Sequence, residues 1–169
     1  MARNVEIKAR VADLAALEQR VRPLADQGPV QLQQDDTFFR NEAGRLKLRE
    51  FADGQGELIF YRRADQAGPK CSHYEITRSA EPARLREVLA QALGVTGRVR
   101  KRRTLYLIGR TRVHLDEVEG LGSFLELEVV LADGEAEADG EACARDLLAA
   151  LGIPPAALLA GAYVDLLAA

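Results

Sequence analysis

The first part of the chain passes from strand periodicity to helix periodicity and back again. Residues 4–11 alternate apolar and charged side chains, as in a strand with one buried face, whereas residues 13–25 carry apolar residues every three or four positions, as in an amphipathic helix. Gly28-Pro29 is predicted to end this helical unit. Three further strands, joined by polar turns that contain glycine, are predicted near 31–40, 45–51 and 57–63.

The second part of the chain repeats this order of elements. A strand at 72–78 is followed by a helix at about 82–93, and three more strands are predicted near 98–107, 111–118 and 123–131. The pattern therefore indicates two strand-helix-strand-strand-strand halves, at about 4–63 and 71–131. A C-terminal helical segment at about 139–169, whose last residues GAYVDLLAA fit a helix or an edge segment, completes a single predicted domain of residues 1–169.

The hairpin connections and the faces of the strands indicate the fold class. Short turns favour antiparallel pairing, and the strand SFLELEVVL at 123–131 has one apolar face that a helix can cover. Its other face carries Glu126 and Glu128. An open sandwich with solvated polar faces would explain each strand alone. Taken together, the strands predict an α+β fold: a closed eight-stranded antiparallel β-barrel, or tunnel, with helices packed outside it.

The composition limits where the protein acts and with what. The 169 residues are 47% hydrophobic and carry a net charge of -3. No apolar run is long enough to span a membrane, and no apolar signal region precedes the first strand, so we expect a cytoplasmic protein with reduced Cys71 and Cys143. The basic run RVRKRR at 98–103 lacks accompanying aromatic residues, so no nucleic-acid partner is predicted. A homodimer is compatible with the sequence.

The predicted interior faces carry charges of both signs, which need a partner because an unpaired buried charge is costly. Lys and Arg neutralise phosphate oxygens, and clustered carboxylates bind Mg²⁺ or Mn²⁺. The neighbouring carboxylates of Glu126 and Glu128, with Glu6 from the first strand, would lose their mutual repulsion if they held such a cation. Arg62 is placed on the inner face because of its phase with Leu58 and Phe60.

Several segments taken together resemble one known family. The sequence resembles the CYTH superfamily, or triphosphate tunnel metalloenzymes, in the segments NVEIKARV, RLKLRE, VRKRRTLY and LDEVEGLGSFLELE. Within this superfamily, the pattern is most similar to that of class IV adenylate cyclases. The likeness extends from residue 4 to about 131, and the tail AYVDLL is similar to the family's C-terminal segment. It implies an eight-stranded antiparallel tunnel that binds a triphosphate and requires a divalent metal, Mg²⁺ or Mn²⁺.

The resemblance also assigns roles to individual residues. Glu6 and Lys8 match the last two members of the family's ExExK motif, and Asn4 replaces its first glutamate, which puts the second metal in doubt. The implied substrate-binding residues are the basic ones: Lys8, Lys47, Arg49, Arg62 (by its strand phase), Lys101, Arg103 and Arg112. The implied metal ligands are Glu6, Asp116, Glu126 and Glu128, and the implied catalytic set is Glu6, Lys8, Glu126 and Glu128.

Three functions follow as hypotheses. The first is an adenylate cyclase that converts ATP to cyclic AMP and pyrophosphate. The second is a triphosphatase that hydrolyses tripolyphosphate, thiamine triphosphate or a nucleotide at the same site. The third is a non-catalytic module that binds a polyphosphate or nucleotide. His73 and His114 are interpreted as wall or surface residues, and Cys71 is not predicted to be a nucleophile because no basic partner is placed beside it.

Overall fold

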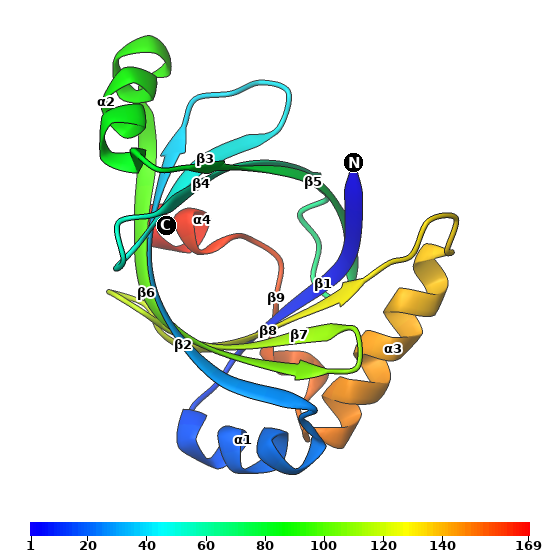
Figure 1. The fold of residues 1–169 in the computed structure, drawn as a ribbon. Helices are drawn as coiled ribbons and strands as arrows, with labels where there is room; N and C mark the ends of the chain where they lie inside the picture. Colours follow the sequence, from blue (N-terminus) through cyan, green and yellow to red (C-terminus); the bar gives the residue numbers. More distant parts are fainter.

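A computed structural model describes residues 1–169 and shows one barrel with helices around it (Figure 1). The first half contains β1 (Ala2–Arg10), α1 (Leu14–Val21), β2 (Gln27–Phe39), β3 (Arg45–Phe51) and β4 (Gly56–Arg63). The second half contains β5 (Lys70–Ser79), α2 (Pro82–Leu93), β6 (Val95–Ile108), β7 (Thr111–Val118) and β8 (Gly122–Val130). The chain ends with α3 (Glu137–Ala150), β9 (Leu158–Leu159) and α4 (Tyr163–Ala168), and short 3-10 turns lie at Arg22–Leu24 and Pro155–Ala157.

The strands close into a ring, which confirms the predicted eight-stranded antiparallel barrel. Their order is β5-β4-β3-β2-β6-β7-β8-β1, and β1 also pairs with β5. All these pairs are antiparallel. The two-residue β9 pairs with β1 at Lys8 and Ala9. The polar alternate positions therefore point into an enclosed space, because successive side chains of a strand lie on opposite faces.

The apolar core lies between the outer face of the barrel and helices α1 and α3. Val5, Leu125 and Leu127 are fully buried in this core, to which α1 contributes the buried Leu17 and α3 the buried Leu148. The other members are Ile7, Ala9, Val21, Tyr106, Val113, Leu115, Val129, Leu131, Ala144 and Leu151. Along each strand these apolar residues alternate with the charged ones. Because the helices cover the apolar face, the charged face points into the barrel.

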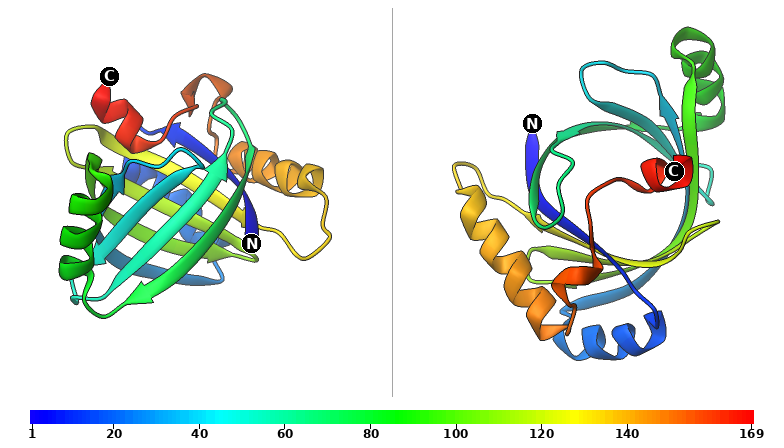
Figure 2. Two further views of the ribbon diagram at one scale, coloured as in Figure 1. Left: turned by 90° about the horizontal axis from the view of Figure 1, so that it is seen from above. Right: turned by 180° about the vertical axis from the view of Figure 1, so that it is seen from behind.

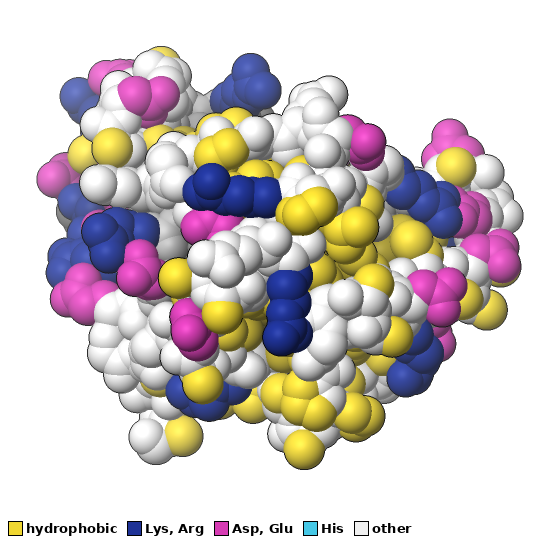
Figure 3. Space-filling view, turned by 90° about the horizontal axis from the view of Figure 1, so that it is seen from below, with side chains coloured by type: hydrophobic (Ala, Val, Ile, Leu, Met, Phe, Trp, Pro, Cys, Tyr) yellow, Lys and Arg dark blue, Asp and Glu magenta, His cyan; other side chains and the backbone are white.

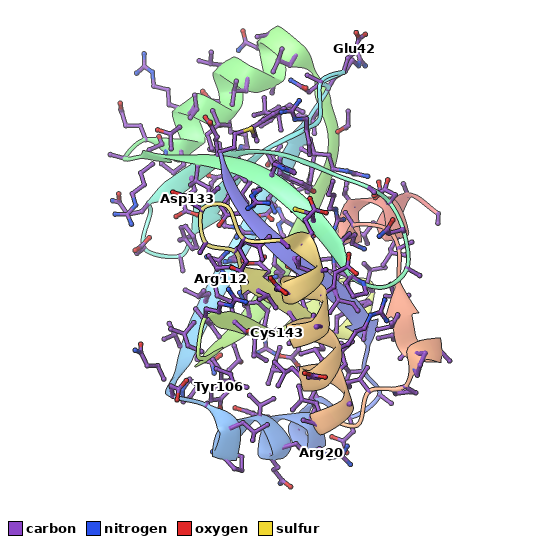
Figure 4. All side chains as sticks on the ribbon, turned by 90° about the vertical axis from the view of Figure 1, so that its right-hand side faces the viewer. Arg20, Glu42, Tyr106, Arg112, Asp133 and Cys143 are labelled. Carbon is purple, nitrogen blue, oxygen red and sulfur yellow. The ribbon has the colours of Figure 1, made fainter.

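Local interactions hold α1 at its place on the barrel. The Asp13 side chain accepts a hydrogen bond from the Ala16 backbone N–H at 3.0 Å, which caps the first turn. Tyr106, on the outer face of β6, donates its hydroxyl proton to Glu18 of α1 at 2.6 Å (Figure 4). Both contacts fix the position of α1 against the barrel.

One local prediction is revised, and the structure decides between the two forms predicted for the tail. Gly28-Pro29 does not separate a helix from a strand but lies inside β2, where the pairing with β6 shifts register between Gln27 and Val30. The tail forms the short helix α4, which lies at one end of the barrel (Figure 2). None of the helices has the length and apolar character needed to cross a bilayer.

The basic run at 98–103 splits between the two faces of β6. On the outer face, Arg98 and Arg100 pair with Asp35 at 2.8 and 3.2 Å. On the face of the molecule seen in Figure 3, acidic and basic side chains are interspersed. The outward Arg98 and Arg100 therefore form ion pairs on the surface, whereas Lys101 and Arg103 of the same run point into the barrel.

Candidate active site

The barrel contains a cavity of about 350 Å³. Side chains from all eight strands and from the start of α4 line this cavity. Most of its polar groups are charged. The lining cations are Lys8, Lys47, Arg49, Arg63, Lys101, Arg103 and Arg112, and the lining carboxylates are Glu6, Asp36, Glu57, Glu126 and Glu128. Nine of the eleven predicted site residues thus line one cavity, and the exceptions are Arg62 and Asp116.

The two glutamates of β8 form one wall of this cavity, and each lies opposite a cation. In the strand register Glu126 is level with Lys8 of β1, and Glu128 is level with Arg112 of β7. Lys8 Nζ is 3.2 Å from Glu126 Oε2, and Arg112 Nε donates to Glu128 Oε2 at 2.8 Å. Burial alone would raise the pKa of Glu126, but Lys8 and other donors hold it well below its usual value, so this carboxylate is charged.

His114 joins these glutamates in a group that can hold a metal ion. One donor atom from each of His114, Glu126 and Glu128 lies within 4.8 Å of the other two. The Nδ1 atom of His114 is buried and has no hydrogen-bond partner, at 3.7 Å from Glu126 Oε1 and 3.9 Å from Glu128 Oε1. An orphaned polar atom beside two carboxylates fits a divalent cation, and the two carboxylates suit Mg²⁺ or Mn²⁺.

Glu6 lies level with Glu128 in the register but is already paired. Its Oε1 accepts from Nη1 of Arg63, a side chain that is 3% exposed. Burial and the nearby Glu126 and Glu128 raise the pKa of Glu6, and Arg63 opposes this rise. Glu6 therefore belongs to the carboxylate wall, although a metal would have to share it with an arginine.

The opposite wall gathers three cations on one buried carboxylate, Asp36 of β2. Its oxygens accept from Lys47 Nζ at 2.9 Å, from Nε and Nη2 of Arg49 at 2.8 Å, and from Lys101 Nζ at 3.2 Å. Burial opposes ionisation of Asp36, but Arg49, Lys101 and Lys47 hold its pKa well below the usual value. Burial lowers the pKa of Lys101 to about 7, because Asp36 offsets only part of the cost of desolvating this ammonium.

Asp116 does not take the position predicted for a metal ligand. It is fully buried behind the lining, and its two oxygens accept from Nε and Nη2 of Arg103, both at 2.7 Å. The hydroxyl of Tyr163 donates to the same carboxylate at 2.7 Å. Because these donors occupy both of its oxygens, Asp116 orients the Arg103 guanidinium and does not join the group of Glu126 and Glu128. Arg103 Nη2 is 3.6 Å from Glu126 Oε1, so it links the two groups.

The inward arginine of β4 is Arg63, so the predicted inward position of Arg62 is wrong. Arg62 lies on the outer face and is exposed, with its guanidinium near Met1. The pairing of strands explains the correction: Ile59 lies opposite the inward Lys47, and residues at even spacing from Ile59 share its face. Glu75, opposite Phe60, is outward for the same reason.

Comparison with known proteins agrees with this architecture. The family model for the CYTH domain matches residues 2–163. The chain belongs to the CYTH family. A search of curated proteins gives no match.

Solved structures share the fold of this CYTH chain at low sequence identity. The PH1012 protein from Pyrococcus horikoshii OT3 is 21% identical with a TM-score of 0.85, over 96% of this chain and 98% of that one. A candidate adenylate cyclase from Vibrio parahaemolyticus is 20% identical with a TM-score of 0.81, over 98% of both chains. A candidate adenylyl cyclase from Hippeastrum with a dominant triphosphatase activity is 17% identical with a TM-score of 0.66, over 95% of this chain and 91% of that one.

At the start of β1, the CYTH chain departs from the ExExK motif at Asn4. Asn4 is 3% exposed, lines the cavity, and leaves its Oδ1 atom without a hydrogen-bond partner. A buried amide oxygen can still ligate a metal but adds no charge. The site therefore keeps the position of the first motif residue while losing one negative charge there.

Proposed function

We propose that this CYTH chain is a metal-dependent enzyme that cleaves a triphosphate held inside the tunnel. The observation that carries the proposal is the separation of charges in one enclosed cavity. Glu126 and Glu128 form an acidic wall with the unpaired His114 nitrogen, and Lys47, Arg49 and Lys101 gather on the facing wall around Asp36. A polyanion would be attracted to the three cations that share one carboxylate, and a divalent cation would be attracted to the two glutamates beside the unpaired His114 nitrogen.

The residues divide into three roles. Glu126 and Glu128, with Glu6, would hold Mg²⁺ or Mn²⁺, which would supply Lewis-acid activation of an attacking oxygen and charge neutralisation at the phosphates. Lys8, Lys47, Arg49, Lys101, Arg103 and Arg112 would bind the phosphate oxygens, with Arg63 in place of Arg62. Their positions are set before the substrate arrives, by carboxylates such as Asp36 and Asp116, so little reorganisation accompanies the reaction.

The first reaction to consider is the conversion of ATP to cyclic AMP and pyrophosphate. The ribose 3'-hydroxyl loses its proton to solvent as its oxygen forms a bond to the α-phosphorus, the bond from this phosphorus to the bridging oxygen breaks, and pyrophosphate leaves. The segment LDEVEGLGSFLELE is similar to class IV adenylate cyclases, and this similarity favours the cyclase reaction. The cationic side chains would stabilise the charge that develops on the leaving pyrophosphate.

Hydrolysis of a triphosphate is the second candidate, and one property of the cavity favours it. The lining has few neutral polar side chains, namely Asn4, Gln34, Ser72 and three tyrosines. Most polar groups of the cavity are therefore suited to bind phosphate, and few are available to bind a nucleoside. The structural neighbour from Hippeastrum, a candidate cyclase with a dominant triphosphatase activity, is a precedent for triphosphate hydrolysis on this fold.

Product analysis distinguishes the candidates. Purified protein is incubated with ATP, tripolyphosphate and thiamine triphosphate, each with Mg²⁺ or Mn²⁺, and cyclic AMP, pyrophosphate and orthophosphate are separated. Cyclic AMP with equimolar pyrophosphate supports the cyclase, whereas orthophosphate without cyclic AMP supports the triphosphatase. Tight binding of a triphosphate with no product under any condition would refute an enzymatic function and leave a binding module.

The same assay tests the acidic wall. Glu126→Gln and Glu128→Gln should each reduce metal-dependent turnover by at least about a hundredfold, which is the upper range for groups that only support a metal ligand. Glu117→Gln is the matched control, because Glu117 lies on the outer face and pairs with the exposed Arg102. Full activity in both wall variants, with normal melting temperatures, would refute the assignment of the metal site.

A further inference from the structure

A second group of metal-binding side chains lies outside the tunnel, at the seam where the barrel closes. Cys71 and His73 are alternate residues of β5 and share its outer face, since Ser72 and Tyr74 line the cavity. Glu137 is the first residue of α3. One donor atom from each of Cys71, His73 and Glu137 lies within 4.8 Å of the other two.

The fold brings these three residues together by two long-range contacts. The first is the pairing of β5 with β1, which sets Cys71 opposite Val5 and His73 opposite Arg3. The second is the packing of α3 on β1 at Gly140. A Cβ atom at Gly140 would lie 2.7 Å from Val5 and from Leu131, so the absent side chain permits this close approach. Glu137 precedes Gly140 by about one helical turn and is thereby held beside β5.

The donor set points to a particular class of ion. A thiolate, an imidazole and a carboxylate are ligands of Zn²⁺, whereas Mg²⁺ and Mn²⁺ prefer oxygen ligands alone. Ligand atoms of a tetrahedral zinc site lie about 3.5 Å apart, given metal–ligand distances of about 2.0–2.3 Å. The separations here, which are at most 4.8 Å, need a contraction of about 1 Å, which side-chain rotation can supply.

The surroundings of Cys71 also favour a cation between the donors. The carboxylate of Glu137 lies beside the Cys71 thiol and places one negative charge there. Glu141 adds a second negative charge nearby. Arg3 is the opposing cation, but its Nη2 atom donates to the carbonyl oxygens of Ala132 and Glu135 at 3.3 and 3.0 Å and is held by that loop.

We propose that Cys71, His73 and Glu137 bind a zinc ion, with water as the fourth ligand, and that this ion fastens α3 to the strand that closes the barrel. The Cys71 sulfur loses its proton to solvent as the metal–sulfur bond forms. This site is distinct from the tunnel group, in which no sulfur is present.

Cobalt absorption tests the proposal without interference from the tunnel. Co²⁺ bound to a thiolate gives a sulfur-to-metal charge-transfer band in the near ultraviolet, and carboxylate or imidazole ligands do not. Titration of the metal-free protein with Co²⁺ should give this band with an intensity that corresponds to one thiolate-bound ion per chain, and Zn²⁺ should remove it. Cys143→Ser is the matched control for the second free cysteine and should keep the band, whereas Cys71→Ser should lose it.

Two further variants address the other ligands and the effect on stability. His73→Gln, at a half-buried position, and Glu137→Gln, at an exposed one, should each weaken Co²⁺ binding at least tenfold. Zn²⁺ should raise the melting temperature of the unaltered protein more than that of Cys71→Ser, because any binding in the tunnel contributes equally to both. The absence of a thiolate band in the unaltered protein, or its persistence in Cys71→Ser, would overturn the proposal even if the tunnel proves active.

Discussion

Replacing Asp36 with asparagine would remove the negative charge that Lys47, Arg49 and Lys101 share. The substitution keeps the shape of the side chain, so packing changes little. The amide oxygen can still accept from one or two of these donors, but the amide NH₂ replaces a charged acceptor with a donor that faces cations. Three buried cations then lie close together without the charge that compensates them.

The size of the effect follows from burial. Asp36 is 1% exposed and receives four charge-assisted hydrogen bonds, so its removal breaks a buried ionic group and not a surface pair. Breaking such a group from one side costs about 3–5 kcal/mol. For a domain of this size, 1 kcal/mol corresponds to about 2–4 °C, so we expect the melting temperature to fall by about 6–20 °C without ligand.

The neighbouring aspartate provides the control. Asp35 points outward and pairs with Arg98 and Arg100, whose side chains are 41% and 52% exposed. Surface pairs of this kind contribute about 0.2–1 kcal/mol, so Asp35→Asn should change the melting temperature by at most a few degrees. Both variants are measured by thermal unfolding at neutral pH. Equal melting temperatures for Asp36→Asn and Asp35→Asn would refute the reasoning.

Both low pH and bound tripolyphosphate should reduce the difference in melting temperature between Asp36→Asn and the unaltered protein. The pKa of Asp36 is lower in the folded than in the unfolded state, so its stabilising effect is present above the usual pKa of 3.8 and is lost as the pH falls below it. Tripolyphosphate supplies negative charge to the same three cations. It should therefore restore part of the stability lost in Asp36→Asn, and raise its melting temperature more than that of the unaltered protein.

Two further predictions concern substrate affinity. Protonated Lys101 has a pKa of about 7 and is the form that attracts phosphate, so the affinity for tripolyphosphate in calorimetric titrations should fall as the pH rises through neutrality. Lys101→Arg should remove this dependence because arginine stays charged, and an unchanged pH profile would exclude Lys101 as its source. Arg63→Ala should weaken tripolyphosphate binding about tenfold or more, and the outward Arg62→Ala should have no effect; the reverse order would contradict the orientation of β4.

The alternation of side chains along the strands was enough to predict most of the interior. In β8 the sequence LELE has an apolar face and an acidic face, and in β3 the sequence RLKLRE separates Leu46 and Leu48 from Lys47. Only one assignment buries the apolar residues under helices, so the charged face has to point inward. The resemblance to the CYTH family added roles to these positions, but the faces themselves follow from the period of the strand.

Where both faces of a strand are apolar, alternation cannot choose between them. In β4 the sequence LIFYRR offers Leu58 and Phe60 on one face and Ile59 and Tyr61 on the other, so the phase of Arg63 depends on the register with β3. The role of Asp36 also depends on pairing across strands, since it becomes visible only when β2 is aligned with β3 and β6. Such contacts are set by tertiary structure, which a pattern within one segment does not contain.

The ion pairs of the tunnel explain how it can be both stable and ready for a ligand. Lys8 pairs with Glu126 and Arg112 with Glu128, so the buried charges are compensated in the absence of substrate. If Glu126 and Glu128 held the proposed divalent cation, Lys8 and Arg112 would be released to bind phosphate oxygens. Binding of the cation would then remove a cost that the proposed triphosphate would otherwise meet, and the converse would hold by linkage. We therefore expect metal binding and triphosphate binding to be coupled through these paired glutamates.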